Sequence, residues 1–351
     1  MGRICLQGIP RGYGRHGLKT ILLAADIYEH GPEGYTQEWE SEKSILLLQE
    51  SLIRLGHSVF LLERPKQVAE FILEYLKGKP REDLIVFNLV EGYQSRNREG
   101  YIPSLCEYLG VSYTGSDTYA QAVCLDKHLL KLICKDLDIL TPKSRRLTNT
   151  SRTINGLKFP LFIKPNGEGS SLGINEESIL HSNFDFERVS DKLFGKYDTL
   201  LLEEFIPGED ITIGLLGHSD HYQLTDPARI SYSGTTYSEQ IKSKSGMPEI
   251  LNFDLPDGIA EHLKQVSLKI ANHLKIIGPA RFDFRWQGEE IYFLELNLTP
   301  GLSKVYSTLP MCWENSGRSY EEMLKLILIS AQERFENSSE QHYGKGIPLY
   351  E

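Results

Sequence analysis

The sequence predicts a fold that combines the α/β and α+β classes, with a parallel sheet first and antiparallel strands later. Residues 1–115 alternate strand-like and helix-like segments, which is typical of a parallel sheet covered by helices. Residues 280–301 instead hold a run with period-two alternation, a short polar connection with a glycine, and a second apolar run, which together indicate a β-hairpin. A chain of 351 residues is long enough for two or three domains.

The first 115 residues predict three strands and three helices in alternation. We expect strands at 21–25, 58–62 and 84–89, and helices at 44–55, 68–76 and 103–109. Gly56 is a good stop for the first of these helices. Residues 28–42 are polar and rich in turn formers, so they predict a loop at the end of a strand, where domains of this kind bind ligands.

The next segment contains a loop that is suited to binding an anion. A helical pattern begins at Asp126-Lys127 and stops at Thr141-Pro142, and an apolar strand at 160–165 carries Lys164. Residues 166–173 follow, with three glycines and two serines that allow backbone N–H groups to turn toward an anion. The loop lacks the Gly-Lys-Ser/Thr ending of a Walker loop. A plain hairpin turn is the alternative, and the preceding lysine speaks against it.

The last third of the chain predicts further strands and two helices. We expect strands at 200–206 and 211–216, a helix at 261–274 and a closing helix at 320–335. Residues 228–250 are rich in Ser, Thr and Tyr, and they predict a mobile loop that contains Lys242. Residues 337–351 predict a polar tail.

The hairpin at 280–301 concentrates polar side chains on one face. With Gln287 paired to Ile291, that face carries Arg281, Asp283, Glu295 and Asn297. Two adjacent carboxylates repel each other unless a cation lies between them, and oxygen ligands of this kind suit Mg²⁺. A solvated strand face with Arg–carboxylate pairs is the alternative. Because Ile291 and Phe293 have the parity of Glu295, we expect them on the same face, in a half-buried cleft.

Composition narrows the function classes. The net charge of −10 argues against a general nucleic-acid binder but is compatible with binding a nucleotide at a local cluster of lysines. The five cysteines are not spaced in pairs as they are in zinc sites. The first residues do not contain the long apolar segment that is typical of a signal peptide. No apolar run approaches the ~20 residues that span a bilayer. We therefore expect a cytoplasmic protein with reduced thiols and no membrane or nucleic-acid partner.

The ordered set of motifs resembles the D-alanine–D-alanine ligase family of the ATP-grasp superfamily, from about Phe87 to about Ala331. The matching stretches are Tyr113-Thr114-Gly115-Ser116, Asp126-Lys127, Thr141-Pro142, Ile163-Lys164-Pro165 with Glu168–Gly173, Glu203 with Gly208, Arg281-Phe282-Asp283, and Glu295-Leu296-Asn297 with Pro300-Gly301. The resemblance implies the three-domain ATP-grasp architecture. It suggests an N-terminal parallel-sheet (pre-ATP-grasp) domain that binds substrate at 1–115, a central subdomain at 116–202 and a C-terminal catalytic subdomain at 203–351.

The resemblance also implies roles for individual residues. It assigns nucleotide binding to Lys127, Lys164, Glu168, Ser170, Ser171, Glu203 and Asp210. The ligands of Mg²⁺ (or Mn²⁺) are Asp283, Glu295 and Asn297. The catalytic groups are Arg281, the backbone N–H of Gly301, Ser170 and Lys242. The amino-acid substrates are assigned to Ser307 and, as the nearest equivalent of the family's N-terminal glutamate, Glu40.

The activity implied is ATP-dependent joining of a carboxylate to an amine through an acyl phosphate. Formation of D-alanyl-D-alanine for peptidoglycan synthesis is the leading expectation, and relatives of this kind are often homodimers. The sequence departs from the family mainly in the amino-acid pocket, where Asn88-Leu89-Val90-Glu91-Gly92 replaces a common His-Gly pair and Ser243 replaces a tyrosine. A ligase for other amino acids or peptides, or a nucleotide-binding homologue without turnover, are the alternatives.

Overall fold

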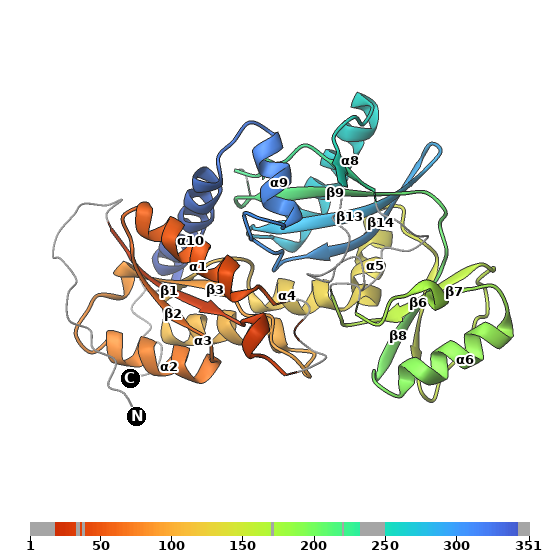
Figure 1. Cartoon of the computed structure of the whole chain (residues 1–351), viewed down its shortest axis with the longest axis horizontal. Coiled ribbons are helices and arrows are strands. Elements are labelled where there is room, and N and C mark those ends of the chain that lie inside the picture. Colours follow the sequence, from red (N-terminus) through yellow and green to blue (C-terminus); the bar gives the residue numbers. More distant parts are fainter. Residues whose placement is uncertain are drawn as a thin grey trace.

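The structure is a computed structural model, and it describes residues 18–32, 36, 39–169, 172–219, 221–231 and 250–342. The strands of these residues form three sheets, which follow one another along the chain (Figure 1). We call them the N-terminal sheet, the central sheet and the C-terminal sheet. The first is parallel throughout, whereas the other two are antiparallel. The sequence-based expectation of a parallel sheet followed by antiparallel strands is therefore confirmed.

The N-terminal sheet has the strand order β2-β1-β3-β4. Its strands are β1 (Thr20–Ala25), β2 (Ser58–Leu62), β3 (Leu84–Leu89) and β4 (Ser112–Tyr113). The helices between them are α1 (Glu42–Arg54), α2 (Pro65–Tyr75) and α3 (Tyr101–Leu109). The three predicted strands and three predicted helices are all present, with ends that differ by up to three residues. Leu22 and Val86 face α2 and α3, whereas Ile21 and Ile85 face the opposite side, as strand alternation requires.

The second face of the N-terminal sheet is covered by a helix from the far end of the chain, α10 (Tyr320–His342). Figure 1 shows α10 beside α1 and the N-terminal strands. The Arg334 guanidinium donates hydrogen bonds to the carbonyl oxygens of Tyr113 and Gly115, which ties the helix to β4. The helix continues to His342, so the prediction of a tail from residue 337 is wrong for its first six residues. The rest of the predicted tail lies outside the described residues.

Two short helices lead from the N-terminal sheet to the rest of the molecule: α4 (Thr118–Leu125) and α5 (Lys127–Asp136). The Asp117 side chain caps α4 by accepting a hydrogen bond from the Ala120 N–H at 2.8 Å. Asp126 caps α5 in the same way through the Leu129 N–H at 3.0 Å. The break at Asp126 places Lys127 in the first turn of α5, where it lines a small cavity.

The central sheet has the strand order β5-β8-β6-β7. Its elements are β5 (Ser144–Thr148), β6 (Leu161–Pro165), β7 (Ile179–Leu180), α6 (Asn183–Phe194) and β8 (Thr199–Glu204). The two strands predicted from apolar runs are confirmed as β6 and β8. Two elements were not predicted from the sequence: β5, an edge strand with exposed arginines, and α6, which covers the sheet (Figure 1).

The C-terminal sheet has the strand order β12-β11-β9-β13-β14, and β10 pairs with β9. Its strands are β9 (Glu209–Leu216), β10 (Gln223–Leu224), β11 (Ala228–Ser231), β12 (Ile250–Asn252), β13 (Ala280–Gln287) and β14 (Glu290–Asn297). Two helices accompany it, α8 (Asp257–Leu274) and α9 (Thr308–Asn315). The loop predicted at 228–250 is wrong at both ends, where β11 and β12 pair with each other. Residues 232–249, including Lys242, lie outside the described residues.

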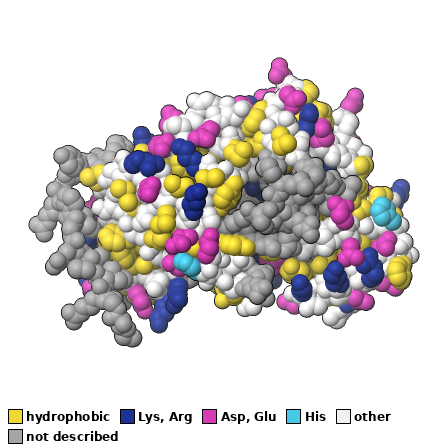
Figure 2. All heavy atoms as spheres, viewed as in Figure 1, with side chains coloured by type: hydrophobic (Ala, Val, Ile, Leu, Met, Phe, Trp, Pro, Cys, Tyr) yellow, Lys and Arg dark blue, Asp and Glu magenta, His cyan; other side chains and the backbone are white. Residues whose placement is uncertain are grey.

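The surface of the molecule mixes charges of both signs. Figure 2 shows basic and acidic side chains interspersed on the face that it presents. On α6, Arg188 and Lys192 both pair with Glu177, at 2.6 and 2.9 Å. Among the helices that the structure describes, none is both long and apolar enough to cross a bilayer.

The hairpin of β13 and β14 has the predicted register at one end and a different register at the other. Asp283 lies opposite Glu295, as predicted. At the turn, however, Gln287 pairs with Glu290 rather than with Ile291. A β-bulge between the two ends inserts one extra residue into β14, which shifts the pairing by one.

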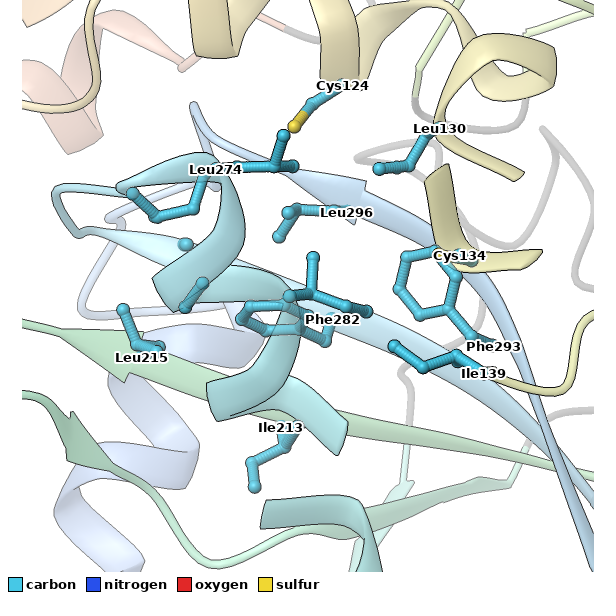
Figure 3. Close-up of a cluster of buried hydrophobic side chains, with 14 of the residues drawn as sticks. Cys124, Leu130, Cys134, Ile139, Ile213, Leu215, Leu274, Phe282, Phe293 and Leu296 are labelled. Carbon is cyan, nitrogen blue, oxygen red and sulfur yellow. The ribbon is translucent and has the colours of Figure 1, made fainter. Parts of the chain in front are cut away.

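The bulge reverses the direction of the side chains that precede it in β14. Ile291 and Phe293 therefore point into the hydrophobic core with Phe282 and Phe284, so the prediction that they share the face of Glu295 is wrong. Figure 3 shows Phe282 and Phe293 in this core, close to the helices α4 and α5. The apolar neighbour of Glu295 in the cleft is instead Leu294, the residue at the bulge.

Candidate active site

A cleft lies between the central and C-terminal sheets, with a volume of about 780 Å³ when its open mouth is included. Strands of both sheets supply its walls. The apolar part of the lining consists of Pro142, Phe162, Ile174, Phe205, Ile206, Ile211, Ile230, Phe284 and Leu294. The polar part includes Lys164, Glu203, Asp210, Asp283, Arg285 and Glu295. Apolar walls with a few convergent polar groups are typical of a site for a small organic ligand.

Glu203 lies between two lysines at one end of this cleft. Its carboxylate oxygens are 3.0 Å from the Lys164 Nζ and 2.9 Å from the Lys131 Nζ, and all three side chains are buried. Burial alone would raise the pKa of Glu203, but the two lysines lower it overall. Burial alone would lower the pKa of Lys164, but the Glu203 carboxylate raises it overall. The two groups therefore stay charged, as a cation and an anion in the wall of the cleft.

Asp210 lies in the wall that the C-terminal sheet supplies, opposite Arg285 on the neighbouring strand. The Arg285 Nη1 donates to the Asp210 Oδ1 at 2.5 Å, and its Nε donates to the carbonyl oxygen of Ile206 at 2.9 Å. This charge-assisted contact holds the carboxylate at the cleft.

A second, smaller cavity adjoins the first at Glu295, which lines both. Lys127 and Arg281 also line it. The Lys127 Nζ is 3.6 Å from the Glu295 Oε2 and donates a hydrogen bond to the carbonyl oxygen of Glu168. Arg281 donates to both oxygens of Asp283, with its Nη2 2.8 Å from the Oδ2. The two carboxylates of the hairpin thus each have a cationic neighbour.

The predicted metal ligands provide oxygen atoms only, the type of donor that Mg²⁺ and Mn²⁺ prefer. Asp283 and Glu295 face each other across the hairpin, and Asn297 follows on the same strand with its Oδ1 accepting a hydrogen bond from the Thr299 N–H at 2.9 Å. The described residues contain no cluster of three His, Cys, Asp or Glu side chains that could hold a metal ion by themselves. The chemistry of the donors nevertheless fits a hard cation that takes its remaining ligands from phosphate oxygens.

The Gly- and Ser-rich loop is tied through Arg98 to the segment that precedes α3. This buried arginine donates to the carbonyl oxygen of Gly167 at 2.8 Å, and its Nη2 lies 3.3 Å from the Glu168 Oε2. The contacts hold the start of the loop beside the second cavity. Ser170 and Ser171 lie outside the described residues, as does Lys242.

Glu40 joins the N-terminal loop to the segment that follows β14. Its Oε1 accepts hydrogen bonds from the Leu302 and Ser303 N–H groups at 3.0 and 3.2 Å and from the Ser307 Oγ at 3.3 Å. Its Oε2 accepts a hydrogen bond of 2.5 Å from the Tyr306 hydroxyl.

Gly301 lies against the same group. A Cβ atom at Gly301 would come within 2.6 Å of the Ser307 Oγ and 3.0 Å of the Glu40 Oε1. The structure therefore brings together Glu40, Gly301 and Ser307, three residues that the sequence analysis assigned to substrate or transition state. Glu40 is far from the other two in the sequence, and the fold brings it to them.

Several residues of the site were not singled out from the sequence. Arg285 has the parity of Arg281 and Asp283, so the alternation in β13 already placed it on the polar face. Lys131 follows Lys127 by one helical turn, which was a usable signal for a shared helix face. Arg98 and Tyr306 lacked any such signal, because their partners are distant in the sequence.

Comparisons with known proteins point to one family. The chain matches the family described as D-ala D-ala ligase C-terminus over residues 134–329. It is 31% identical over 296 residues to the D-alanine–D-alanine ligase of Aquifex aeolicus, covering 82% of this chain and 96% of the relative. It is 25% identical over 328 residues to an uncharacterised protein of Sinorhizobium fredii, covering 91% and 93% of the two chains.

A solved structure supports the same fold. The D-alanine–D-alanine ligase from Bacillus anthracis complexed with ATP matches with a TM-score of 0.71 at 21% identity, over 91% of this chain and 99% of that one. The ATP-grasp fold predicted from the order of the motifs is thereby confirmed.

Proposed function

This chain belongs to the D-alanine–D-alanine ligase family and is an ATP-dependent ligase, and we propose that it joins two D-alanine molecules into D-alanyl-D-alanine for peptidoglycan synthesis. One observation carries the proposal. Glu295 lines both cavities, so a ligand that extends past it connects the apolar cleft with the cavity that holds Arg281. ATP has the required shape, because its base suits an apolar cleft and its phosphates suit a polar one.

In this arrangement the base of ATP lies among the apolar walls, near Glu203. Asp210 is the acceptor for the ribose hydroxyls, and Lys164 and Lys127 neutralise the phosphates from either side. The start of the loop at 166–173, held by Arg98 and Lys127, offers backbone N–H groups to the phosphate oxygens. These residues bind and align the nucleotide, which is most of what phosphoryl transfer requires.

Asp283, Glu295 and Asn297 would hold Mg²⁺ or Mn²⁺ at the phosphates. When bound, the ion supplies positive charge that offsets the repulsion between the phosphates and the incoming carboxylate. The chain keeps the two carboxylates in place through Arg281, Thr212 and Lys127; the Thr212 hydroxyl donates to the Asp283 Oδ1 at 2.8 Å.

The reaction then has two steps. A carboxylate oxygen of the first D-alanine attacks the γ-phosphorus, the bond to the ADP oxygen breaks, and an acyl phosphate forms. The amine of the second D-alanine, after losing a proton, attacks the carbonyl carbon, and phosphate leaves. Arg281 and the backbone N–H of Gly301 stabilise the oxyanion of the second step, and donors of this kind are worth about 3–4 kcal/mol each. Ser307 and Glu40 hold the amino acids.

A phosphate-release assay over a panel of D- and L-amino acids, with mass spectrometry of the product, tests the proposal. Phosphate release that requires D-alanine, with a dipeptide product, is expected. Release with another amino acid would replace D-alanine by that substrate. Absence of release with every amino acid would overturn the proposal in favour of a nucleotide-binding homologue.

A ligase for another amino acid is the second candidate, and a specific observation favours it. Glu91, from the segment that replaces the family's common His-Gly pair, lines the second cavity together with Arg281. A carboxylate there changes the charge that a substrate side chain meets, so a cationic amino acid belongs in the panel.

We also propose that the chain acts in the cytoplasm, as expected from the sequence. The four cysteines of the described residues are free and buried, which suits a reducing compartment. The homodimer expected from the family resemblance remains a proposal, which light scattering of the purified protein tests.

A further inference from the structure

Two lysines of α5, Lys127 and Lys131, lie one turn apart and reach two different carboxylates. Lys127 contacts Glu295 at the junction of the two cavities, whereas Lys131 contacts Glu203 at the base end of the cleft. One helix therefore supplies a cation to each end of the site. The proposed function gives Lys127 a ligand, the phosphates, but leaves Lys131 without one.

Lys131 lies behind the wall of the cleft rather than in it. Glu203 and Lys164 line the cavity, and Lys131 is absent from the described lining. Its Nζ donates to the Thr141 Oγ1 at 2.7 Å and lies 2.9 Å from the Glu203 Oε2, and its side chain is only 3% exposed. A lysine enclosed in this way contacts Glu203 but has no path to a bound nucleotide.

Burying a charged lysine is costly, and apolar residues of similar volume often stabilise a core as well or better. A reason other than stability is therefore needed. Lys164 provides one, because it lines the cavity and a triphosphate would compete with Glu203 for it. When Lys164 is shared between Glu203 and the triphosphate, Lys131 is the cation that stays in contact with Glu203.

A carboxylate offers only hydrogen-bond acceptors. Adenine presents an amino group at position 6, whereas guanine presents an oxygen there. A Glu203 carboxylate that stays ionised and fixed in the cleft would accept a hydrogen bond from the former and repel the latter. On the basis of the proposed function, we infer that Lys131 is a positioning residue that holds Glu203 so that the cleft selects adenine over guanine nucleotides.

Binding of ATP and of GTP, measured by calorimetry, tests the inference in the full-length protein. The variant is Lys131→Met, and the matched control is Lys135→Met, an exposed lysine one turn further along α5. We expect the ratio of ATP to GTP affinity to fall about tenfold in Lys131→Met and to stay unchanged in the control. A wild-type ratio in Lys131→Met would overturn the inference.

A double-variant cycle separates a role through Glu203 from a general structural role. In a Glu203→Gln background, adding Lys131→Met should change the ratio less than about twofold, because its target is already gone. A full tenfold loss in that background would overturn the inference. Lys131→Arg, which keeps the charge, should retain most of the wild-type ratio.

Two outcomes distinguish this inference from the proposed function. Wild-type protein that binds neither nucleotide would refute the proposed function itself. Wild-type protein that binds ATP, together with a variant that discriminates normally, would refute only the role of Lys131. If Lys131→Met does not fold, Lys131→Gln, which lacks the charge but can still bond to Thr141, must show the same loss.

Discussion

The two ends of the cleft differ in the ratio of carboxylates to cationic side chains. At the end proposed to hold the base, a single carboxylate, Glu203, lies between two lysines at 2.9 and 3.0 Å. At the end proposed to hold the phosphates, two carboxylates, Asp283 and Glu295, face each other across the hairpin. Asp283 is held by an arginine of its own strand, while the Lys127 Nζ lies 3.6 Å from the Glu295 Oε2.

This difference supports the proposal that one end binds a base and the other binds phosphates together with a metal ion. An excess of lysines around one acid keeps that acid ionised and fixed, which suits recognition of a hydrogen-bond donor on a base. Two opposed acids with a nearby amide oxygen gain most from an added cation, which suits a metal bound with phosphates. Four variants, at Glu295, Lys164, Glu40 and Glu177, test this contrast, and their expected effects decrease in that order.

Removing an acid at the phosphate end should have the largest effect. Glu295→Ala should lower the Mg²⁺-dependent release of ADP about 10³-fold, because the phosphates lose a ligand of the neutralising cation. Thermal unfolding should stay close to wild type. Glu289→Ala, in the exposed turn of the same hairpin, is the control. Near-normal turnover in Glu295→Ala would remove the contrast between the two ends.

Lys164 pairs with Glu203 and is also proposed to bind the phosphates, so removing its side chain should weaken nucleotide binding. Lys164→Ala should lower ATP affinity about 10–100-fold, since hydrogen bonds between charged groups are worth about 1.5–3 kcal/mol. Calorimetry measures this effect, with the exposed Lys158→Ala as control. Unchanged ATP affinity would show that Lys164 serves Glu203 alone.

A change in the amino-acid pocket should leave both ends of the nucleotide cleft intact. Glu40→Gln should raise the KM for the amino acid about tenfold, because the amide is a weaker acceptor for an ammonium group. ATP affinity should not change. Glu42→Gln, exposed at the start of α1, is the control. A parallel loss of ATP affinity would contradict the separation of the two pockets.

Removing Glu177, a surface carboxylate between two cations, should have the smallest effect, and that effect is on stability. Lys192 and Arg188 lower the pKa of Glu177 to about 2, below its ordinary value of 4.5. Because the pKa is lower in the folded state, the stabilisation is present above pH 4.5 and is lost as the pH falls toward 2. It should be small, since the group is exposed.

Urea unfolding of wild type and Glu177→Gln at pH 6 and pH 3 measures this term. The difference between the two proteins should be smaller at pH 3, and Glu187→Gln, on the helix that carries Arg188 and Lys192, is the control. An equal difference at both values would show that Glu177 does not act through its charge, unlike Glu203 in the cleft.

Much of this architecture could be predicted from local patterns. The alternation of apolar runs and helical spacing placed all three main strands of the N-terminal sheet. The period-two pattern of β13 placed Arg281 and Asp283 on one face, and the structure joins them by a salt bridge. Such predictions succeed because side-chain direction within a helix or strand depends on residues close in sequence.

The bulge in β14 could not be predicted from local patterns. Parity placed Phe293 beside Glu295, but one extra residue sends Phe293 into the core. The predicted pairing of Asp283 with Glu295 still held, because the shift at the turn and the bulge compensate each other. Alternation alone does not reveal a one-residue insertion between two strands.

Local motifs and periodicity were enough to predict the family, most of the main strands and helices, and the residue types that an ATP-dependent ligase needs. They did not predict that α10 covers the N-terminal sheet, that Arg98 holds the loop at Gly167, or that Lys131 contacts Glu203. The physical reason is that these contacts join segments far apart in the chain. Their partners are selected by how whole sheets and helices pack, and no local periodicity records that choice.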